Sequence, residues 1–342
     1  MPASYDADNK GRITRWAAMA IKAKIYLFEG NWTQVKNITS TIMTEGGFRL
    51  FGSYAGLFEI ANEYNSEVIL DAQYRPTSRE HQMMYAFLPP SLGGYSQLSP
   101  LQELVDSYIM LDGKTIRETG TSFDESNPYA NRDPRLKATV MYTGNSYTLA
   151  DGTEVVINCE KGEGKDGYGV GSDCSATGYY IKKYWDNTYR ATLYSGLNPI
   201  LIRYADILLM NAEALAELGE LDKTAWDATI KPIRDRAGFT LASAVEFPEG
   251  ASKDKLIEIV RNERRSELAL EGHRHKDIIR WRIADDVLNG WCHGLKTNEV
   301  VGTDNGYVRV ENRAFNANKH YLWPIPQAER DLNGNLVQNP NW

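Results

Sequence analysis

Cysteine is scarce in this sequence of 342 residues, and its spacing does not suit a zinc site. The three cysteines are Cys159, Cys174 and Cys292, and none belongs to a CxxC pair, the arrangement typical of structural zinc. Cys159 and Cys174 flank a glycine-rich stretch. They form either one disulfide or two free thiols, and both arrangements fit their spacing.

A basic excess and a long apolar run are also missing. The 38 Lys and Arg face 45 Asp and Glu, a formal net charge of -7, whereas a general nucleic-acid surface needs a basic stripe. No apolar run approaches the roughly 18 residues of a membrane-spanning helix. The polar N-terminal stretch has no apolar core like that of a secretory signal. We therefore expect no nucleic-acid partner, and either a cytoplasmic protein or a chain without its natural start.

Motifs for metal, nucleotide and nucleophilic chemistry are missing too. There is no GxSxG, no HExxH, no Walker loop and no GxGxxG that opens a helix after a strand. His273 and His275, with Asp277 beside them, are the nearest approach to a ligand group. On a helix, residues two apart face different sides. We expect no metal and no cofactor, with calcium in the glycine-rich loops of 144–178 left open.

Tyrosine and tryptophan, in contrast, are abundant. The chain holds 20 Tyr and 8 Trp against 9 Phe. Their rings combine an apolar face with a polar edge, which suits a wet surface that stacks on a ligand such as a sugar. The alternative is that they fill the seams between helices with their hydroxyls at the rim.

Two stretches have the pattern of helical hairpins. Residues 12–47 and 200–238 both place small and bulky apolar side chains at helical spacing. The glycine that ends the first helix in each is Gly30 or Gly219. This pattern is typical of tetratricopeptide-like repeats. We predict a mostly α-helical protein in which such hairpins form an α-α superhelix scaffold with a loop- and short-strand-rich insert.

The same patterns divide the chain into four segments. Residues 1–70 are predicted to be tetratricopeptide-like helices, and residues 71–199 a loop-rich insert that binds ligand. Residues 200–290 continue the helical scaffold. Residues 291–342 form a C-terminal tail, which we expect to pack back on the scaffold because it contains tryptophans.

The helix predicted at 253–272 carries an unusual number of charges. Glu263, Glu267 and Glu271 share one face at a spacing of four. The nearby arginines are Arg264, Arg265 and Arg274. Paired carboxylates can act on glycosides, but carboxylates among arginines form ion pairs and stay ionised. We interpret this cluster as a structural network that holds helix against helix.

The segment 74–95 combines aromatic rings with polar side chains in what is predicted to be a loop. An arc of rings with a few hydrogen-bonding partners can hold a sugar chain without cutting it. The alternative is a loop that only packs on the helices. Composition supports both interpretations.

Ordered blocks along the whole chain resemble the SusD/RagB-like nutrient-binding proteins of the outer membrane. One of them is "RNERRSELALEGHRHKDIIRW". The blocks lie at 11–32, 65–74, 101–114, 131–136, 199–220, 233–238, 261–281 and 311–342. The chain resembles the C-terminal two-thirds of a family member, so part of any ligand site would lie outside it.

The resemblance implies a function without catalysis. It implies glycan or oligosaccharide binding at the cell surface and delivery to a partner SusC-like TonB-dependent transporter. The parent protein would be a surface-exposed outer-membrane lipoprotein, in contact with the membrane only through a lipid anchor absent from this chain. The alternative is a helical-repeat scaffold that binds proteins and no sugar.

The resemblance also points to the loop at 74–98 as a source of sugar-stacking residues. The ligand-binding candidates are Tyr74, Arg75, His81, Tyr85, Phe87 and Tyr95. A second group in "YYIKKYWDNTYR" comprises Tyr184, Trp185 and Tyr189.

Overall fold

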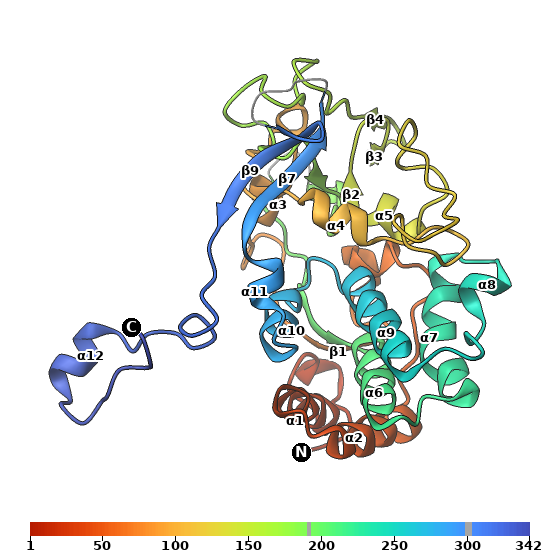
Figure 1. Cartoon of the computed structure of the whole chain (residues 1–342), viewed down its shortest axis with the longest axis vertical. Helices are drawn as coiled ribbons and strands as arrows, with labels where there is room; N and C mark the ends of the chain where they lie inside the picture. Colours follow the sequence, from red (N-terminus) through yellow and green to blue (C-terminus); the bar gives the residue numbers. More distant parts are fainter. Residues whose placement is uncertain (190–192, 298–302) are drawn as a thin grey trace.

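The computed structural model describes residues 1–189, 193–297 and 303–342, and it is mostly helical with short strands (Figure 1). The helices are α1 Arg15–Glu29, α2 Trp32–Glu45, α3 Met83–Phe87, α4 Gln102–Ser107, α5 Pro134–Thr139, α6 Tyr204–Leu218, α7 Lys223–Ala237, α8 Ala242–Val245, α9 Lys253–Glu267, α10 Arg274–Arg280, α11 Ala284–Val287 and α12 Gln327–Leu332. The strands are β1 Val68–Asp71, β2 Val140–Met141, β3 Ser146–Thr148, β4 Glu154–Val156, β5 Tyr180–Ile181, β6 Ile200–Arg203, β7 Gly290–Lys296, β8 Thr303–Asp304 and β9 Tyr307–Arg313.

Capping residues mark the ends of the two helices in the first predicted hairpin. The Thr14 side chain accepts a hydrogen bond from the Ala17 amide and caps α1. Gly30, with φ 71°, ends α1 in the left-handed conformation that glycine adopts without strain. The side chain of Asn31 then caps α2. The helical hairpin predicted at 12–47 is confirmed.

The second hairpin, α6 and α7, lies directly beside the first. Helix α2 packs along α6, and the Asn211 side-chain amide donates to Thr39 Oγ1 at 2.9 Å across that contact. On the chain's path into α6, β6 pairs antiparallel with β1. Helix α9 packs against α6 as well. The hairpins thus form one helical body, while their stacking as a tetratricopeptide-like superhelix and the four segment boundaries remain predictions.

The insert between the hairpins is built on a core rich in tyrosine. Two-stranded pairs β2–β5 and β3–β4 enclose it. Tyr147 and Tyr180 are fully buried there, and their hydroxyls donate to the carbonyls of Ile181 at 2.8 Å and Asp166 at 2.6 Å. Part of the tyrosine excess therefore fills the interior, and the hydroxyls of these two residues are satisfied there by backbone carbonyls.

The C-terminal part consists of a sheet and a tail. Strands β7, β9 and β8 form a three-stranded sheet that was not predicted, although "YVRVENR" alternates as a strand does. Beyond Arg313 the tail still contacts the body near α11, where the Tyr321 hydroxyl donates to Asp285 at 2.9 Å, and its last part, with α12, extends away (Figure 1). Trp323 is 78% exposed. The ring of Trp342 lies against His320, a contact within the tail. The tail therefore contacts the body around Tyr321, and its docking as a whole remains a prediction.

The cysteines are all free thiols. Cys159 is buried in the core of the insert, and burial raises the pKa of its thiol to about 12. The Cys174 thiol donates to the Lys165 carbonyl at 3.2 Å. Of the two arrangements left open by the sequence, the structure has free thiols.

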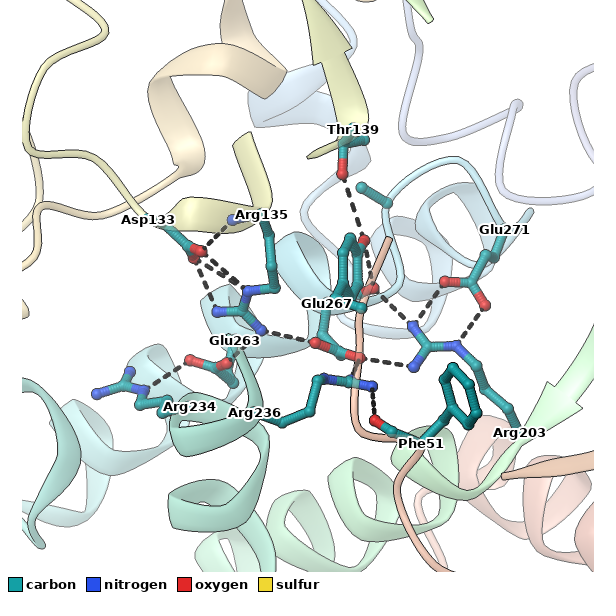
Figure 2. A network of polar contacts seen from close by, with 12 residues as sticks. Phe51, Asp133, Arg135, Thr139, Arg203, Arg234, Arg236, Glu263, Glu267 and Glu271 are labelled. Atoms are coloured by element: carbon teal, nitrogen blue, oxygen red, sulfur yellow. Dashed lines mark hydrogen bonds and ion pairs between the residues drawn. The ribbon is translucent and has the colours of Figure 1, made fainter. Parts of the chain in front are cut away.

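A buried ion network joins distant segments of the chain (Figure 2). Its acids are the predicted Glu263, Glu267 and Glu271, each with almost no solvent exposure of the side chain. The cations come from elsewhere than α9: Arg135 (α5), Lys183, Arg203 (β6), Arg234 and Arg236 (α7). The structural interpretation is confirmed, but the partners differ from those expected, because the neighbouring arginines of α9 point to other acids or to none.

Glu267 is the centre of this network. Arg135 contacts its Oε2 at 2.8 Å, Arg203 contacts its Oε1 at 2.6 Å, and Arg236 also pairs with Oε1. Burial by itself would raise the pKa of Glu267, but the guanidinium groups outweigh burial and hold the pKa well below its usual value. Glu267 therefore stays ionised and serves as the shared counterion of α5, β6 and α7.

Glu271 extends the network to the insert. Arg203 donates to both of its oxygens, at 2.7 and 2.8 Å, and Lys183 pairs with it at 2.7 Å. Burial would raise its pKa, but Arg203 and Lys183 lower that pKa to about 2. Burial lowers the pKa of Lys183 to about 8, against the attraction of Glu271.

Replacing Glu267 by glutamine should destabilise the protein severely. It leaves the buried guanidinium groups without their shared charge, and removal of one partner of a buried pair costs about 3–5 kcal/mol. Chemical denaturation measures the loss. Glu258→Gln is the matched control, because that side chain is 62% exposed and its ion pair with Lys255 lies at the surface, so about 1 kcal/mol or less is expected. Equal losses for the two variants would contradict a central role of Glu267.

The free energy of unfolding should fall as the pH is lowered from about 4.5 towards 2. In that window the unfolded state binds a proton at Glu271, with an ordinary pKa of 4.5, while the folded state, with a pKa of about 2, does not. One such carboxyl contributes at most about 1.4 kcal/mol per pH unit. Urea unfolding at several pH values measures this slope. Glu271→Gln should flatten it, and an unchanged slope would contradict the assignment.

Candidate functional site

The predicted ligand-binding segment forms a folded loop against residues 193–198. Arg75 and Arg79 pair through their backbones, at 2.8 and 3.0 Å. His81 pairs in the same way with Ser195, at 2.9 Å in both directions. A Cβ on Gly196 would lie 2.3 Å from the nitrogen of Pro76. Glycine is therefore needed where the two loops meet.

Tyr74 and His81 meet edge to face, with ring centroids 4.7 Å apart. His81 Nε2 donates to the Leu197 carbonyl at 2.8 Å, and its Nδ1 accepts from the Met83 amide at 3.3 Å. Both ring nitrogens are thus used within the protein, and His81 supports the loop. Arg79 lies over the Tyr74 ring at 5.4 Å. Arg75, at the turn, is exposed.

Tyr85, Tyr95 and Tyr194 form a group of accessible rings, called the aromatic surface below. Tyr85 and Tyr95 stack with centroids 5.6 Å apart and planes at 26°. Tyr194 stands nearly perpendicular to Tyr85, at 6.1 Å. Tyr95 is 48% exposed and Tyr194 42% exposed. These rings offer apolar faces beside hydroxyl groups, which is the chemistry that a sugar ring requires.

The loop returns Tyr95 to Tyr85 through a tight turn. The Tyr95 amide donates to the Tyr85 carbonyl at 2.8 Å. A Cβ on Gly94 would lie 2.1 Å from the Leu88 carbonyl oxygen. Only glycine permits this approach of backbone to backbone, so "PPSLGGY" holds the two rings together.

Two of the predicted ligand-binding residues belong to the core. Phe87 is 3% exposed and Tyr184 is 8% exposed, and both lie in the hydrophobic cluster of the insert. Burial raises the pKa of Tyr184. Phe87 lies on the buried face of the short helix α3, and Tyr85 on the same helix is partly buried against that cluster. Phe87 and Tyr184 are therefore removed from the site.

Trp185 lines a separate pocket of about 330 Å³. Its Nε1 donates to the Thr148 carbonyl at 3.1 Å, and the edge of its ring meets Tyr147 at 5.1 Å. Glu59 faces the same pocket, and burial, followed by the nearby charge of Asp186, raises the pKa of Glu59. Tyr189 ends a short 3-10 helix, and its side chain lies outside the described part of the chain.

Tyr194 was missed in the sequence. It stands in "LYSGLNP", a stretch with the serine, glycine and proline of a loop, so the signal of an aromatic residue in a loop was present. Its approach to Tyr85 depends on the pairing of His81 with Ser195. Residues more than a hundred positions apart cannot be paired from spacing alone.

His273, His275 and Asp277 have separate surroundings. Asp277 pairs with Arg264 at 2.9 Å and with Arg280, while His275 lies near Trp323. Burial lowers the pKa of His273 to about 4. Within residues 1–189, 193–297 and 303–342, no three His, Cys, Asp or Glu side chains are grouped to hold a metal ion. No helix of that part is long and apolar enough to cross a membrane.

The model of the SusD family matches residues 57–342. The chain belongs to the SusD family. A SusD-like protein, P25, of Formosa agariphila is 28% identical over 98% of this chain and 60% of its own length. A SusD-like protein of Bacteroides ovatus is 25% identical over 89% of this chain and 54% of its own. This SusD-family chain therefore spans less than two thirds of these relatives.

Solved structures of SusD-like proteins have the same fold. One from Bacteroides fragilis is 27% identical with a TM-score of 0.82, over all of this chain and 68% of its own. A second from the same species, described as a SusD-like carbohydrate-binding protein, is 31% identical with a TM-score of 0.85, over 98% of this chain and 68% of its own. The resemblance seen in the sequence blocks is thereby confirmed.

Gly94→Ala should disturb the aromatic surface. Its Cβ would overlap the Leu88 carbonyl, so the turn must open, and forcing in an extra carbon costs about 1–3 kcal/mol. Urea unfolding measures the loss. Gly52→Ala is the matched control, because a Cβ there meets nothing within 4 Å. A Gly94 variant as stable as the Gly52 variant would show that the turn is not constrained.

Proposed function

We propose that this SusD-family chain binds glycans through the aromatic surface and does not cleave them. The observation that carries the proposal is the accessible stack of Tyr85 and Tyr95 with Tyr194 beside it. The relative from Bacteroides fragilis described as carbohydrate-binding supports it. The alternative of a scaffold that binds only proteins has less support, because it gives no role to these exposed rings.

The geometry suits weak, shape-based recognition of a sugar chain. The stacked pair offers the face of Tyr95, and Tyr194 makes a wall almost perpendicular to Tyr85. A pyranose packs its C–H groups on such a face and donates its hydroxyls to neighbouring polar groups. Arg75 and Arg79 are exposed on the same loop. Tyr74, Arg75, Tyr85, Tyr95 and Tyr194 make up the proposed ligand-binding set.

The absence of catalysis is part of the proposal. A glycosidase needs a carboxylic acid that is protonated near neutral pH beside a second carboxylate. The conspicuous acids of α9 have lowered pKa values because cations surround them. The aromatic surface consists of three tyrosines, Tyr85, Tyr95 and Tyr194. It can hold a glycan, but it offers no acid–base pair.

We further propose that the parent protein works at the cell surface as an outer-membrane lipoprotein. In this role it would hand oligosaccharides to a SusC-like TonB-dependent transporter. Membership of the SusD family supports this. The chain spans 60% of the length of its relative P25.

Replacing Tyr95 by alanine should weaken glycan binding. The ring is 48% exposed and stacks only on Tyr85 among the described rings, so the protein should keep its fold. Stacking of one nucleic-acid base on an aromatic side chain contributes about 1–3 kcal/mol. We take this as the scale for one sugar ring on Tyr95, and we expect the affinity for the glycan to fall roughly tenfold. Affinity electrophoresis in gels that contain neutral polysaccharides measures retardation.

Phe28→Ala is the control, because Phe28 is 54% exposed on α1, at the opposite end of the molecule from α3 (Figure 1). It should leave the retardation unchanged. A reducing-sugar assay on the retained polysaccharide should detect no release. Retardation that survives both Tyr95→Ala and Tyr85→Ala would contradict the site, and release of sugar ends would contradict the absence of catalysis.

A further inference from the structure

His293 lies on β7, where the C-terminal sheet packs against α4 (Figure 1). It is paired across the sheet with Arg309 of β9. Asp304 of β8 is paired with Tyr307, also of β9. Residues paired on neighbouring strands point to the same face of a sheet, and so do residues two apart on one strand. His293, Arg309 and Asp304 therefore share one face, although β9 lies between β7 and β8.

Both ring nitrogens of His293 contact a carboxylate. Nδ1 lies 2.7 Å from Oε1 of Glu103 on α4, and Nε2 lies 3.0 Å from Oδ2 of Asp304 on β8. The His293 amide also donates to the two oxygens of the Glu103 carboxylate, at 3.1 and 3.3 Å. One imidazole ring thus joins α4 to β8. We call Glu103, His293 and Asp304 the histidine bridge.

The two ring contacts require a protonated imidazole. A neutral ring has one N–H donor and one acceptor, whereas the charged ring donates from both nitrogens, and an ionised carboxylate only accepts. Both carboxylates can therefore be hydrogen-bonded to His293 only while the ring is charged. In a neutral ring, the nitrogen without a proton would face an oxygen that also accepts.

The other charged groups around the ring do not replace this proton. Arg309 from β9 pairs with Asp304. Arg265 from α9 donates to the backbone carbonyl of Glu103 and not to its carboxylate. Cys292, the neighbour of His293 on β7, is a buried thiol whose pKa is raised by burial. Further charged groups on α4, β7 and β9 have other partners: Asp106 pairs with Arg117, Lys296 with Glu125, and Glu311 with Arg313.

The ring is accessible enough to exchange its proton with the medium. The side chains of His293, Glu103 and Asp304 are 24%, 42% and 36% exposed. Burial by itself would lower the pKa of His293, but the hydrogen bonds to Asp304 and Glu103 outweigh burial and raise the pKa above its ordinary value of 6.5. The charge of the ring therefore changes as the pH rises through and above neutrality.

We propose that the histidine bridge is a pH-sensitive link, which joins α4 to β8 while the His293 ring is protonated and opens when the ring is neutral. A neutral ring keeps at most one of its two contacts, so in either tautomer it no longer joins the two elements. Neither carboxylate is then left alone, because Glu103 keeps the His293 amide and Asp304 keeps Arg309. The bridge shares no residue with the aromatic surface, so the proposal does not depend on glycan binding.

Opening the bridge would loosen the C-terminal sheet from the insert. Gln102 on α4 accepts a hydrogen bond from the buried Tyr179 hydroxyl, and Val105 of the same helix belongs to the core cluster of the insert. Strand β8, in contrast, is held by its backbone pairing with β9. That pairing does not depend on the ring. We therefore expect β8 to become more mobile at high pH without unfolding of the insert.

An NMR titration of the histidine ring protons tests the charge of the bridge, with His293→Gln to identify the signal. The pKa of His293 should lie above its ordinary 6.5. Asp304→Asn and Glu103→Gln should each lower it, because each removes a negative charge beside the ring. Asp8→Asn, at an exposed position near the N-terminus, should leave it unchanged. A His293 pKa at or below 6.5, or one that neither bridge variant lowers, would overturn the proposal.

Hydrogen–deuterium exchange of the whole chain tests the opening itself. Peptides that cover residues 303–309 should lose protection between about pH 5.5 and about pH 8, after correction for the intrinsic effect of pH on exchange. His293→Gln should abolish this difference, and thermal unfolding should show that the variant is folded, because the side chain lies near the surface. Equal protection of the wild-type peptides at the two pH values would overturn the proposal, and so would the same pH dependence in His293→Gln.

Discussion

The structure depends on one buried carboxylate shared by three guanidinium groups. Glu267 ends α9, and its partners Arg135, Arg203 and Arg236 come from α5, β6 and α7. A charge taken out of water is tolerated only with such partners. The same contact therefore stabilises the protein and selects one arrangement of segments that are far apart in the chain.

This network also sets the position of the proposed glycan surface. Arg203 pairs with Glu67 at 2.8 Å, immediately before β1, and so fixes the antiparallel pairing of β1 with β6. Beyond β1 the chain continues into the loop of Tyr85, and ahead of β6 it carries Tyr194. The pairing of His81 with Ser195 then brings the two rings together. The buried ion network thus lies in the interior, and the aromatic surface that it helps to position is accessible.

Local signals in the sequence identified the long helices of the two hairpins and α9, but not the short helix α3, which lies in a segment predicted as a loop. They were also insufficient for the contacts between helices. The stop at Gly30 marked the end of the first helix of the first hairpin correctly. The three acids Glu263, Glu267 and Glu271 were recognised as structural. Their partners were sought among arginines close by in the sequence, because spacing reports only neighbours along the chain. Phe87 and Tyr184 looked equivalent to Tyr85 in composition. In the structure Phe87 and Tyr184 are buried, whereas Tyr85 is only partly buried. Burial follows from the tertiary fold rather than from the residue type.

The central claim is that a glycan contacts the aromatic surface held in place by this network. Hydrogen–deuterium exchange, followed by mass spectrometry with and without a neutral glycan that the protein retains, tests it most directly. The account predicts slower exchange in peptides that cover residues 83–98 and 193–198, with the helices α1 and α2 unchanged. Protection confined to other segments, with no change around Tyr85 and Tyr95, would contradict it.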